Sequence, residues 1–223
     1  MFSVIFEVRP RADSWDTYLG LAASLRPELE QIDGFVDNIR YRSLTREGWL
    51  LSLSNWRDEK AVVRWRTKAH HHEVQEKGRG GVLSDYHLRV GQITQDTQPP
   101  KGYAITEQRL DETQTGTGTT AMLIDAKQPE HWVKAEKPDA IADWLGVDRN
   151  TAGLIAWDVF DAVLSPGEII ALLSWRDAAS AQASARRVKL PEGARLRTVR
   201  VVRDYGMFDR REAPQYYPDV ERP

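Results

Sequence analysis

Residues 54–58, Ser-Asn-Trp-Arg-Asp, and residues 173–177, Leu-Ser-Trp-Arg-Asp, share the tripeptide Trp-Arg-Asp, which begins at Trp56 and again 119 positions later at Trp175. Each tripeptide stands at the end of an apolar, strand-like run and at the start of an alanine-containing, helix-like run. Its aspartate is a residue type that caps helices. Because the match recurs at the same place in the order of elements, the sequence predicts an internal repeat of one supersecondary unit.

Hydrophobic periodicity around the first tripeptide predicts the element order β-α-β-β-α-β. The expected strands are residues 4–8, 35–44, 49–56 and 86–93, and the expected helices run from Ser14 to a stop at Gly34 and from Asp58 to about Lys77. Pro27 lies inside the first of these helices and is expected to kink or split it. This order of elements is that of the split-βαβ, ferredoxin-like motif.

The second half of the chain repeats this order in outline. Its expected elements are a strand at residues 122–124, a helix carrying residues 141–145, a hairpin of residues 154–164 and 168–175, a short alanine-rich helix after Asp177, and a last strand at residues 196–208. We therefore predict an α+β fold, with two tandem ferredoxin-like (βαββαβ) units in one chain.

A polar connection between the two units suggests the division into domains. Residues 1–97 form the first expected domain and residues 120–209 the second, divergent one. The linker, residues 98–119, begins with a polar stretch that contains Pro and Gly, and it includes a candidate extra strand over residues 103–110. Residues 210–223 are a Pro- and Tyr-rich C-terminal extension, which is expected to run over the surface or onto a second chain.

The composition excludes several kinds of chemistry. The 223 residues contain 31 Lys and Arg against 33 Asp and Glu, a net charge of −2, so we expect no nucleic-acid partner. The chain has no cysteine, which excludes disulfides, thiolate nucleophiles, iron–sulfur clusters and cysteine-ligated zinc. Because no apolar run approaches the roughly 20 residues that span a bilayer, and the N-terminus has no basic leader, we expect no membrane partner and a cytoplasmic location.

Several motifs in the first half resemble, in the same order, those of the antibiotic biosynthesis monooxygenase domain family. The motifs are Phe6-Glu7-Val8-Arg9-Pro10, residues 25–35 (LRPELEQIDGF), residues 51–59 (LSLSNWRDE), and Trp65-Arg66 followed by His71, Gln75 and Gly78-Arg79. The resemblance covers residues 2–95 and implies a dimeric α+β barrel, in which two ferredoxin-like units place their sheets together. In this chain we expect the repeat to build that barrel from one polypeptide, as a monomer or as a homodimer formed through the C-terminal extension.

The resemblance also implies an activity. Relatives include cofactor-independent oxygenases of aromatic polyketides, which implies a monooxygenase that acts with O₂ on a planar aromatic or phenolic small molecule, without a cofactor or metal. Other relatives degrade heme and typically carry an Asn on the first strand, near the position where this chain has Glu7, so heme degradation is not expected. The alternative function is a non-catalytic protein of the same fold whose cavity holds a small hydrophobic ligand or heme.

Trp65 is the first candidate for substrate binding. On the second expected helix it shares one face with Val62, Ala69 and His72. Such a stripe is typical either of a core anchor or of an aromatic wall beside a planar ligand. The resemblance to the oxygenases favours the wall.

His70, His71 and His72 follow one another in the second expected helix. Consecutive helical residues point about 100° apart, so the three side chains cannot jointly bind one metal ion. Periodicity favours His72 as the residue beside Trp65, whereas the family resemblance favours His71. Both remain candidates for the base that takes a proton from a phenolic substrate, and His70 is expected to face solvent.

Two strand residues complete the candidate site. Asn38 shares a strand face with Val36 and Arg40, and it needs a hydrogen-bonding partner if that face is buried. The partner is either a substrate oxygen or, on an exposed face of the sheet, water. His87 alternates with Tyr86 on the last strand of the first unit. We predict that Asn38 and His87 bind substrate together with Trp65.

Overall fold

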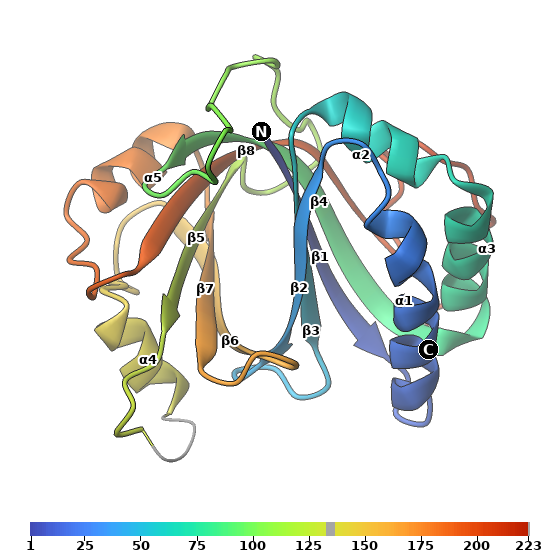
Figure 1. Cartoon of the computed structure of the whole chain (residues 1–223), viewed down its shortest axis with the longest axis horizontal. Coiled ribbons are helices and arrows are strands. Elements are labelled where there is room, and N and C mark those ends of the chain that lie inside the picture. The colour runs from blue at the N-terminus through green and yellow to red at the C-terminus, as the bar shows by residue number, and fades with distance from the viewer. Residues whose placement is uncertain (133–136, 223) are drawn as a thin grey trace.

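The computed structural model describes residues 1–132 and 137–222, and its strands close into one antiparallel barrel (Figure 1). The strands are β1 (Phe2–Pro10), β2 (Phe35–Ser43), β3 (Leu50–Trp56), β4 (Leu83–Asp96), β5 (Thr120–Lys127), β6 (Leu154–Ala162), β7 (Glu168–Trp175) and β8 (Arg195–Gly206). Around the barrel they follow the order β1-β3-β2-β6-β7-β5-β8-β4. The pairs β2 with β6 and β4 with β8 join the two halves of the chain.

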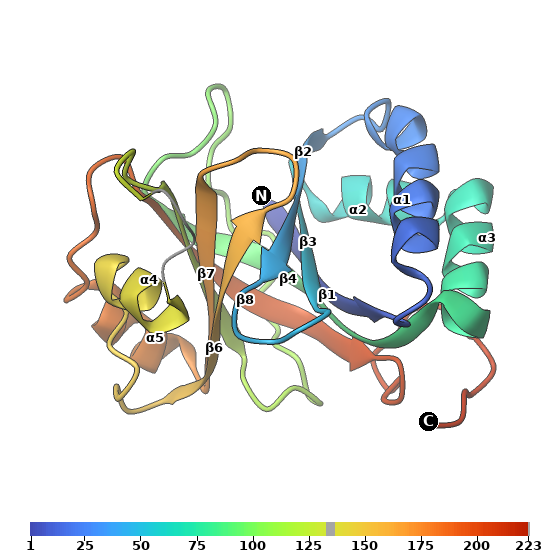
Figure 2. The same cartoon turned by 90° about the horizontal axis from the view of Figure 1, so that it is seen from below.

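The helices lie outside the barrel in two groups (Figure 2). The helices of the first half are α1 (Trp15–Leu29), α2 (Glu59–Arg66) and α3 (Ala69–Lys77), followed by the π-helical turn η1 (Gly78–Val82), and those of the second half are α4 (Pro138–Trp144) and α5 (Ala178–Ala185). Each half therefore has the order β-α-β-β-α-β, with α2 and α3 together in the place of one helix. The predicted α+β fold of two ferredoxin-like units is confirmed.

The repeated tripeptide marks a junction that is built in the same way in both halves. Asp58 accepts a hydrogen bond from the backbone N–H of Ala61, at 2.8 Å, and Asp177 caps α5 through the N–H of Ser180, at 2.7 Å. The residue before each aspartate donates its backbone N–H to a glycine carbonyl, from Arg57 to Gly34 and from Arg176 to Gly153, at 2.8 Å in both cases. Both glycines have a φ near +90°, a conformation that favours glycine.

Two expectations about local structure are wrong, those of one continuous second helix and of a strand over residues 103–110. The expected second helix is broken after Thr67, where Lys68 adopts an extended backbone and α3 then begins at Ala69. Pro27 does not split α1, because it lies in the last turn on the exposed side of the helix.

Residues 103–110 form no strand, because the closed barrel offers no free edge to pair with. Side chains hold this segment instead. The Gln92 side-chain oxygen accepts hydrogen bonds from the backbone N–H groups of Gln108 and Arg109, at 2.7 Å each.

Three layers of buried side chains result from this architecture. One fills the barrel, one lies between the first sheet and α1–α3, and one lies between the second sheet and α4 and α5. The second and third layers contain Trp56 and Trp175 respectively, which are both 0% exposed.

Within the described ranges, no helix has the length and apolar character needed to cross a membrane.

Candidate functional site

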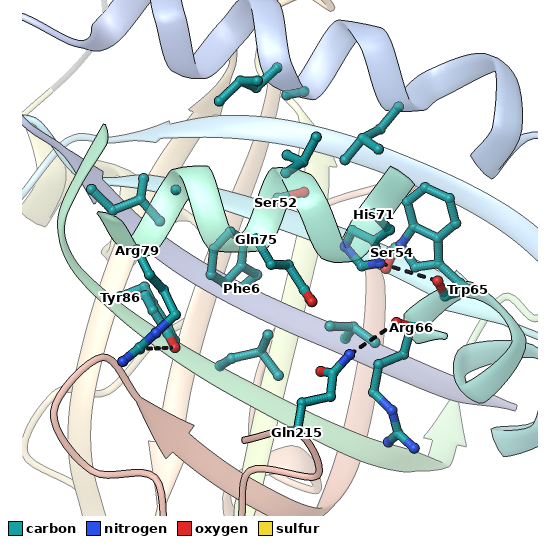
Figure 3. A pocket seen from close by; sticks show the side chains of 18 of the residues that line it. Phe6, Ser52, Ser54, Trp65, Arg66, His71, Gln75, Arg79, Tyr86 and Gln215 are labelled. Atoms are coloured by element: carbon teal, nitrogen blue, oxygen red, sulfur yellow. Dashed lines mark hydrogen bonds between the residues drawn. The ribbon is translucent and has the colours of Figure 1, made fainter. Parts of the chain in front are cut away.

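A cavity of about 210 Å³ lies between the outer face of the first sheet and the helices α1 and α3 (Figure 3). Its walls are mainly apolar and come from both layers, with Val4, Phe6, Leu21, Ala22, Leu25, Leu29, Val62, Val74, Val82, Leu83, Leu88 and Val90 among them. Three further lining residues, Arg210, Gln215 and Tyr217, belong to the C-terminal extension. An apolar cavity with a few polar groups is the usual form of a small-molecule site, and this one is smaller than the roughly 300–1,000 Å³ typical for drug-sized ligands.

The break between α2 and α3 brings Trp65 and His71 together at one end of this cavity. Their rings stack with centroids 4.3 Å apart and planes inclined by 18°, and both residues line the cavity. His71 Nδ1 lies 3.2 Å from the Trp65 carbonyl oxygen, so Nδ1 carries the proton and donates it, while Nε2 keeps its lone pair. The pair forms a flat wall that presents one hydrogen-bond acceptor.

Burial controls the charge of His71. It lowers the pKa of the imidazole to about 4, against a smaller opposing effect of the hydrogen bond to the Trp65 carbonyl. His71 is therefore neutral at physiological pH. Proton abstraction from a phenol requires a base with a pKa near neutrality. His71, with its lowered pKa, is a weaker base than such a group.

His72 does not line the cavity. Its Nδ1 lies 2.8 Å from the hydroxyl oxygen of Tyr217, and its Nε2 lies 3.5 Å from Glu76. The prediction of a face shared by Trp65 and His72 is wrong, because it assumed one continuous helix and the chain turns at residues 67 and 68. His72 instead helps to seat the C-terminal extension on α3.

The two strand candidates lie on opposite faces of the first sheet. Asn38 lines the cavity, but its amide nitrogen already donates to Ser52 Oγ at 3.0 Å and to the Leu53 carbonyl at 3.2 Å. Only its carbonyl oxygen is available to a ligand. His87 points into the barrel, because its neighbours Tyr86 and Leu88 point to the cavity and strand side chains alternate.

His87 belongs to a buried polar network. Its Nε2 lies 2.7 Å from Asp204 and its Nδ1 lies 3.6 Å from Glu7. Burial lowers the pKa of His87, but the hydrogen bond to Asp204 and the nearby Glu7 carboxylate outweigh this effect and raise it overall. The structure therefore separates His87 from the cavity, contrary to the prediction that it binds substrate.

The sequence reasoning missed a group of basic residues around the cavity. Arg40, Arg66, Arg79 and Arg210 all line it, and Arg79 and Arg210 both donate hydrogen bonds to the hydroxyl oxygen of Tyr86, at 2.8 and 2.6 Å. Arg79 and Arg210 lie far apart in the sequence, and no periodicity connects them. Arg66 and Arg79 stand in motifs of the family resemblance and Arg40 stands beside Asn38 on its strand, but nothing in the sequence spacing pointed to Arg210.

The described residues hold no group of three His, Asp or Glu side chains that is arranged to bind a metal ion. The cavity also does not fit heme, because its volume of about 210 Å³ is below the range of drug-sized pockets and heme is larger than most such ligands.

Fold and cavity together define an α+β barrel protein with an apolar cavity between the sheet and the helices of its first unit. The model of the antibiotic biosynthesis monooxygenase family matches residues 1–77, which include Asn38, Trp65 and His71. A protein of Pyricularia oryzae named jasmonate monooxygenase ABM is 50% identical over 223 residues, covering 98% of this chain and 99% of that protein. The chain therefore belongs to the antibiotic biosynthesis monooxygenase family.

The chain is also similar to solved structures, of which the first named here supports the fold. An aldoxime dehydratase covers 90% of this chain and 80% of its own, with a TM-score of 0.54 and 12% identity. A crystal structure of an antibiotic biosynthesis monooxygenase covers 44% of this chain and 100% of its own, with a TM-score of 0.37 and 16% identity. At these identities the likeness concerns the fold and not the reaction.

Proposed function

We propose that this protein is a monooxygenase that uses O₂ to oxygenate a small, largely apolar molecule bound in the cavity of the first unit, without a bound cofactor. Membership of the family supports the reaction class. The observation that carries the proposal is the stacked pair of Trp65 and His71, which forms one wall of an apolar cavity. A flat wall of this kind positions an apolar substrate, and the surrounding side chains exclude water.

Jasmonate is the first substrate to test, because it is the compound in the name of the relative that is 50% identical over nearly the whole chain. It is a small carboxylate with an apolar body, which suits the size and the lining of the cavity. Transfer of one oxygen atom from O₂ to jasmonate consumes two electrons and two protons, and the second oxygen atom leaves as water. An electron donor must therefore be present in the assay.

A planar polycyclic phenol is the second candidate, and the flat face of Trp65 favours it. When such a phenol carries a ring methylene, O₂ converts the methylene to a carbonyl and the other oxygen atom leaves as water, so no external donor is needed. The charge state of His71 speaks against this route. Transfer of a proton from a phenol of pKa about 10 to an imidazole of pKa about 4 is uphill by about 8 kcal/mol.

Product analysis with ¹⁸O₂ tests the proposal directly. Wild-type protein with jasmonate and an electron donor should give a product heavier by one ¹⁸O atom, and Trp65→Phe and His71→Ala should each lower its rate of formation by at least about tenfold. His70→Ala is the matched control, because His70 bonds Glu28 at 2.6 Å and does not line the cavity. Unlabelled product, or rates unchanged in both site variants, would refute the proposed function.

A further inference from the structure

Two arginine side chains meet at the cavity without an acidic partner. Arg79 is part of the π-helical turn η1, and Arg210 belongs to the C-terminal extension. Both reach the hydroxyl oxygen of Tyr86, and Figure 3 shows Arg79 and Tyr86 at the opposite end of the cavity from Trp65 and His71. Within residues 1–132 and 137–222, no Asp or Glu oxygen lies within 4.0 Å of either guanidinium.

Arg79 differs from two other deeply buried arginines because it has no carboxylate partner. Arg89 is 4% exposed and pairs with Glu7, and Arg197 is 2% exposed and pairs with Asp125. Arg79 is 6% exposed, yet its partners are the neutral Tyr86 hydroxyl and the carbonyls of Met207 and Pro218. Its Nε is buried without a hydrogen-bond partner among the described residues, as are those of Arg89 and Arg197, so the difference lies in the missing carboxylate. The fold therefore supplies an anion to two of these three arginines and leaves the third without one.

The positive charge of Arg210 adds to the free-energy cost of burying Arg79 without a counter-charge. Arg210 donates to Tyr86 and to the Gln215 carbonyl, and both guanidiniums lie near the Tyr217 ring, at 5.6 Å for Arg79 and 5.3 Å for Arg210. Contacts with the aromatic face offset part of the desolvation of the two cations. Two like charges in an apolar cavity still lack the counter-charge that repays burial.

We infer that Arg79 and Arg210, joined through Tyr86, bind the carboxylate of an otherwise apolar acid. The Tyr86 hydroxyl accepts two hydrogen bonds from the arginines, so its own proton remains to be donated. Guanidinium and phenol groups together match the planar, two-oxygen geometry of a carboxylate. The inference places this acid in the cavity of the proposed function and names its substrate class as carboxylates.

The C-terminal extension is part of this site. It contributes Arg210, and its Gln215 side chain donates to the Arg66 carbonyl at 3.0 Å. The Tyr217 hydroxyl donates to the Gln75 side-chain oxygen at 2.8 Å, and the ring is 7% exposed. The extension thus packs on α2, α3 and η1 of its own chain, and it brings the second cation of the pair to the cavity.

Binding measured without an electron donor separates this inference from turnover. The probes are jasmonate and decanoate, each compared with its primary amide, which has nearly the same shape and no charge. Calorimetry should show each acid binding wild-type protein about tenfold or more tightly than its amide, since hydrogen bonds to a charged group are stronger than those to a neutral one. Arg210→Gln should lower the affinity for the acids about tenfold and leave that for the amides within about twofold.

Arg211→Gln is the matched control, because Arg211 is an exposed neighbour that pairs with Asp209, and it should keep the preference for acids. Arg210→Gln is the lead variant because Arg79 also ties down the Met207 and Pro218 carbonyls. An equal affinity for acid and amide in the wild type, failure of both acids to bind, or a preference that survives in Arg210→Gln and disappears in Arg66→Gln would overturn the inference.

Activity then distinguishes the two proposals. Acids that bind through Arg210 but give no ¹⁸O product would refute only the monooxygenase function. Labelled product together with an unchanged preference in Arg210→Gln would refute only the carboxylate site.

Discussion

Protonation of His71 should destabilise the protein between pH 7.5 and pH 5.0. Burial places its pKa near 4 in the folded chain, whereas an unfolded histidine titrates near 6.5. The unfolded state therefore binds more protons below about pH 6.5 than the folded state does. The contribution of His71 to stability is complete above that pH and declines as the pH falls toward 4.

The size of the effect follows from the two pKa values. At pH 7.5 the imidazole is neutral in both states, so the difference is close to zero. At pH 5.0 the unfolded histidine is almost fully protonated while the folded one is mostly neutral, which lowers the free energy of unfolding by about 2 kcal/mol.

Urea unfolding of wild type and His71→Gln at the two pH values measures this difference. The glutamine amide can still donate to the Trp65 carbonyl, so the variant removes the titration and keeps the local hydrogen bond. The wild type should lose about 2 kcal/mol more than His71→Gln on going from pH 7.5 to pH 5.0. All other titrating groups are shared and cancel in this comparison.

His70→Gln is the control. It keeps the His71 imidazole, so its loss of unfolding free energy between the two pH values should follow that of the wild type. If wild type and His71→Gln lose the same free energy between the two pH values, or if NMR titration of His71 gives a pKa near 6.5, the description of a neutral, buried imidazole is wrong.

Two further predictions concern the scaffold. Gly34→Ala should lower the free energy of unfolding by about 2–4 kcal/mol, because φ is +90° and a Cβ there lies 2.7 Å from an alanine Cβ of α2. Gly193→Ala is the matched control, with φ of +75° and nothing within 4 Å of the added Cβ. It should lose only the backbone strain, about 1–2 kcal/mol. Equal losses in thermal unfolding would show that the contact is unimportant. Glu7→Gln should destabilise by about 3–5 kcal/mol, because Arg89 then becomes an unpaired buried charge. Asp33→Asn, at an ion pair that is largely exposed, should leave thermal unfolding nearly unchanged, and a similar loss in both variants would contradict the role of burial.

The repeat was predictable because its signals are local. A helix cap, a buried tryptophan and the glycine before the hairpin each act within a few residues, and Trp56 and Gly34 recur 119 positions later as Trp175 and Gly153. These features depend on φ, on capping and on alternation, which neighbouring residues decide. The same reasoning placed Trp65 and Asn38 on elements that line the cavity.

The rest of the site depends on contacts that sequence spacing does not contain. The choice between His71 and His72 is decided by the helix break between α2 and α3, and a break of two residues leaves little trace in periodicity. The direction of His87 follows from which face of the sheet meets α1 and α3. Arg210 reaches the cavity only because β8 pairs with β4 and the chain then turns back over η1.

The proposed site lies in the first unit of the barrel. The packing between the sheet and the helices differs between the two units. Helix α1 of the first unit has 15 residues, whereas its counterpart α4 has 7 and ends at Trp144, whose ring lies 5.1 Å from that of Trp132. These side chains occupy the space between the second sheet and its helices. The second unit nevertheless completes the first, because β8 supplies Asp204 to His87 and leads into the extension that carries Arg210. A chain cut after β4 would therefore lose the barrel closure and the second cation of the cavity together, so the repeat is needed for the site even though the site lies in one half.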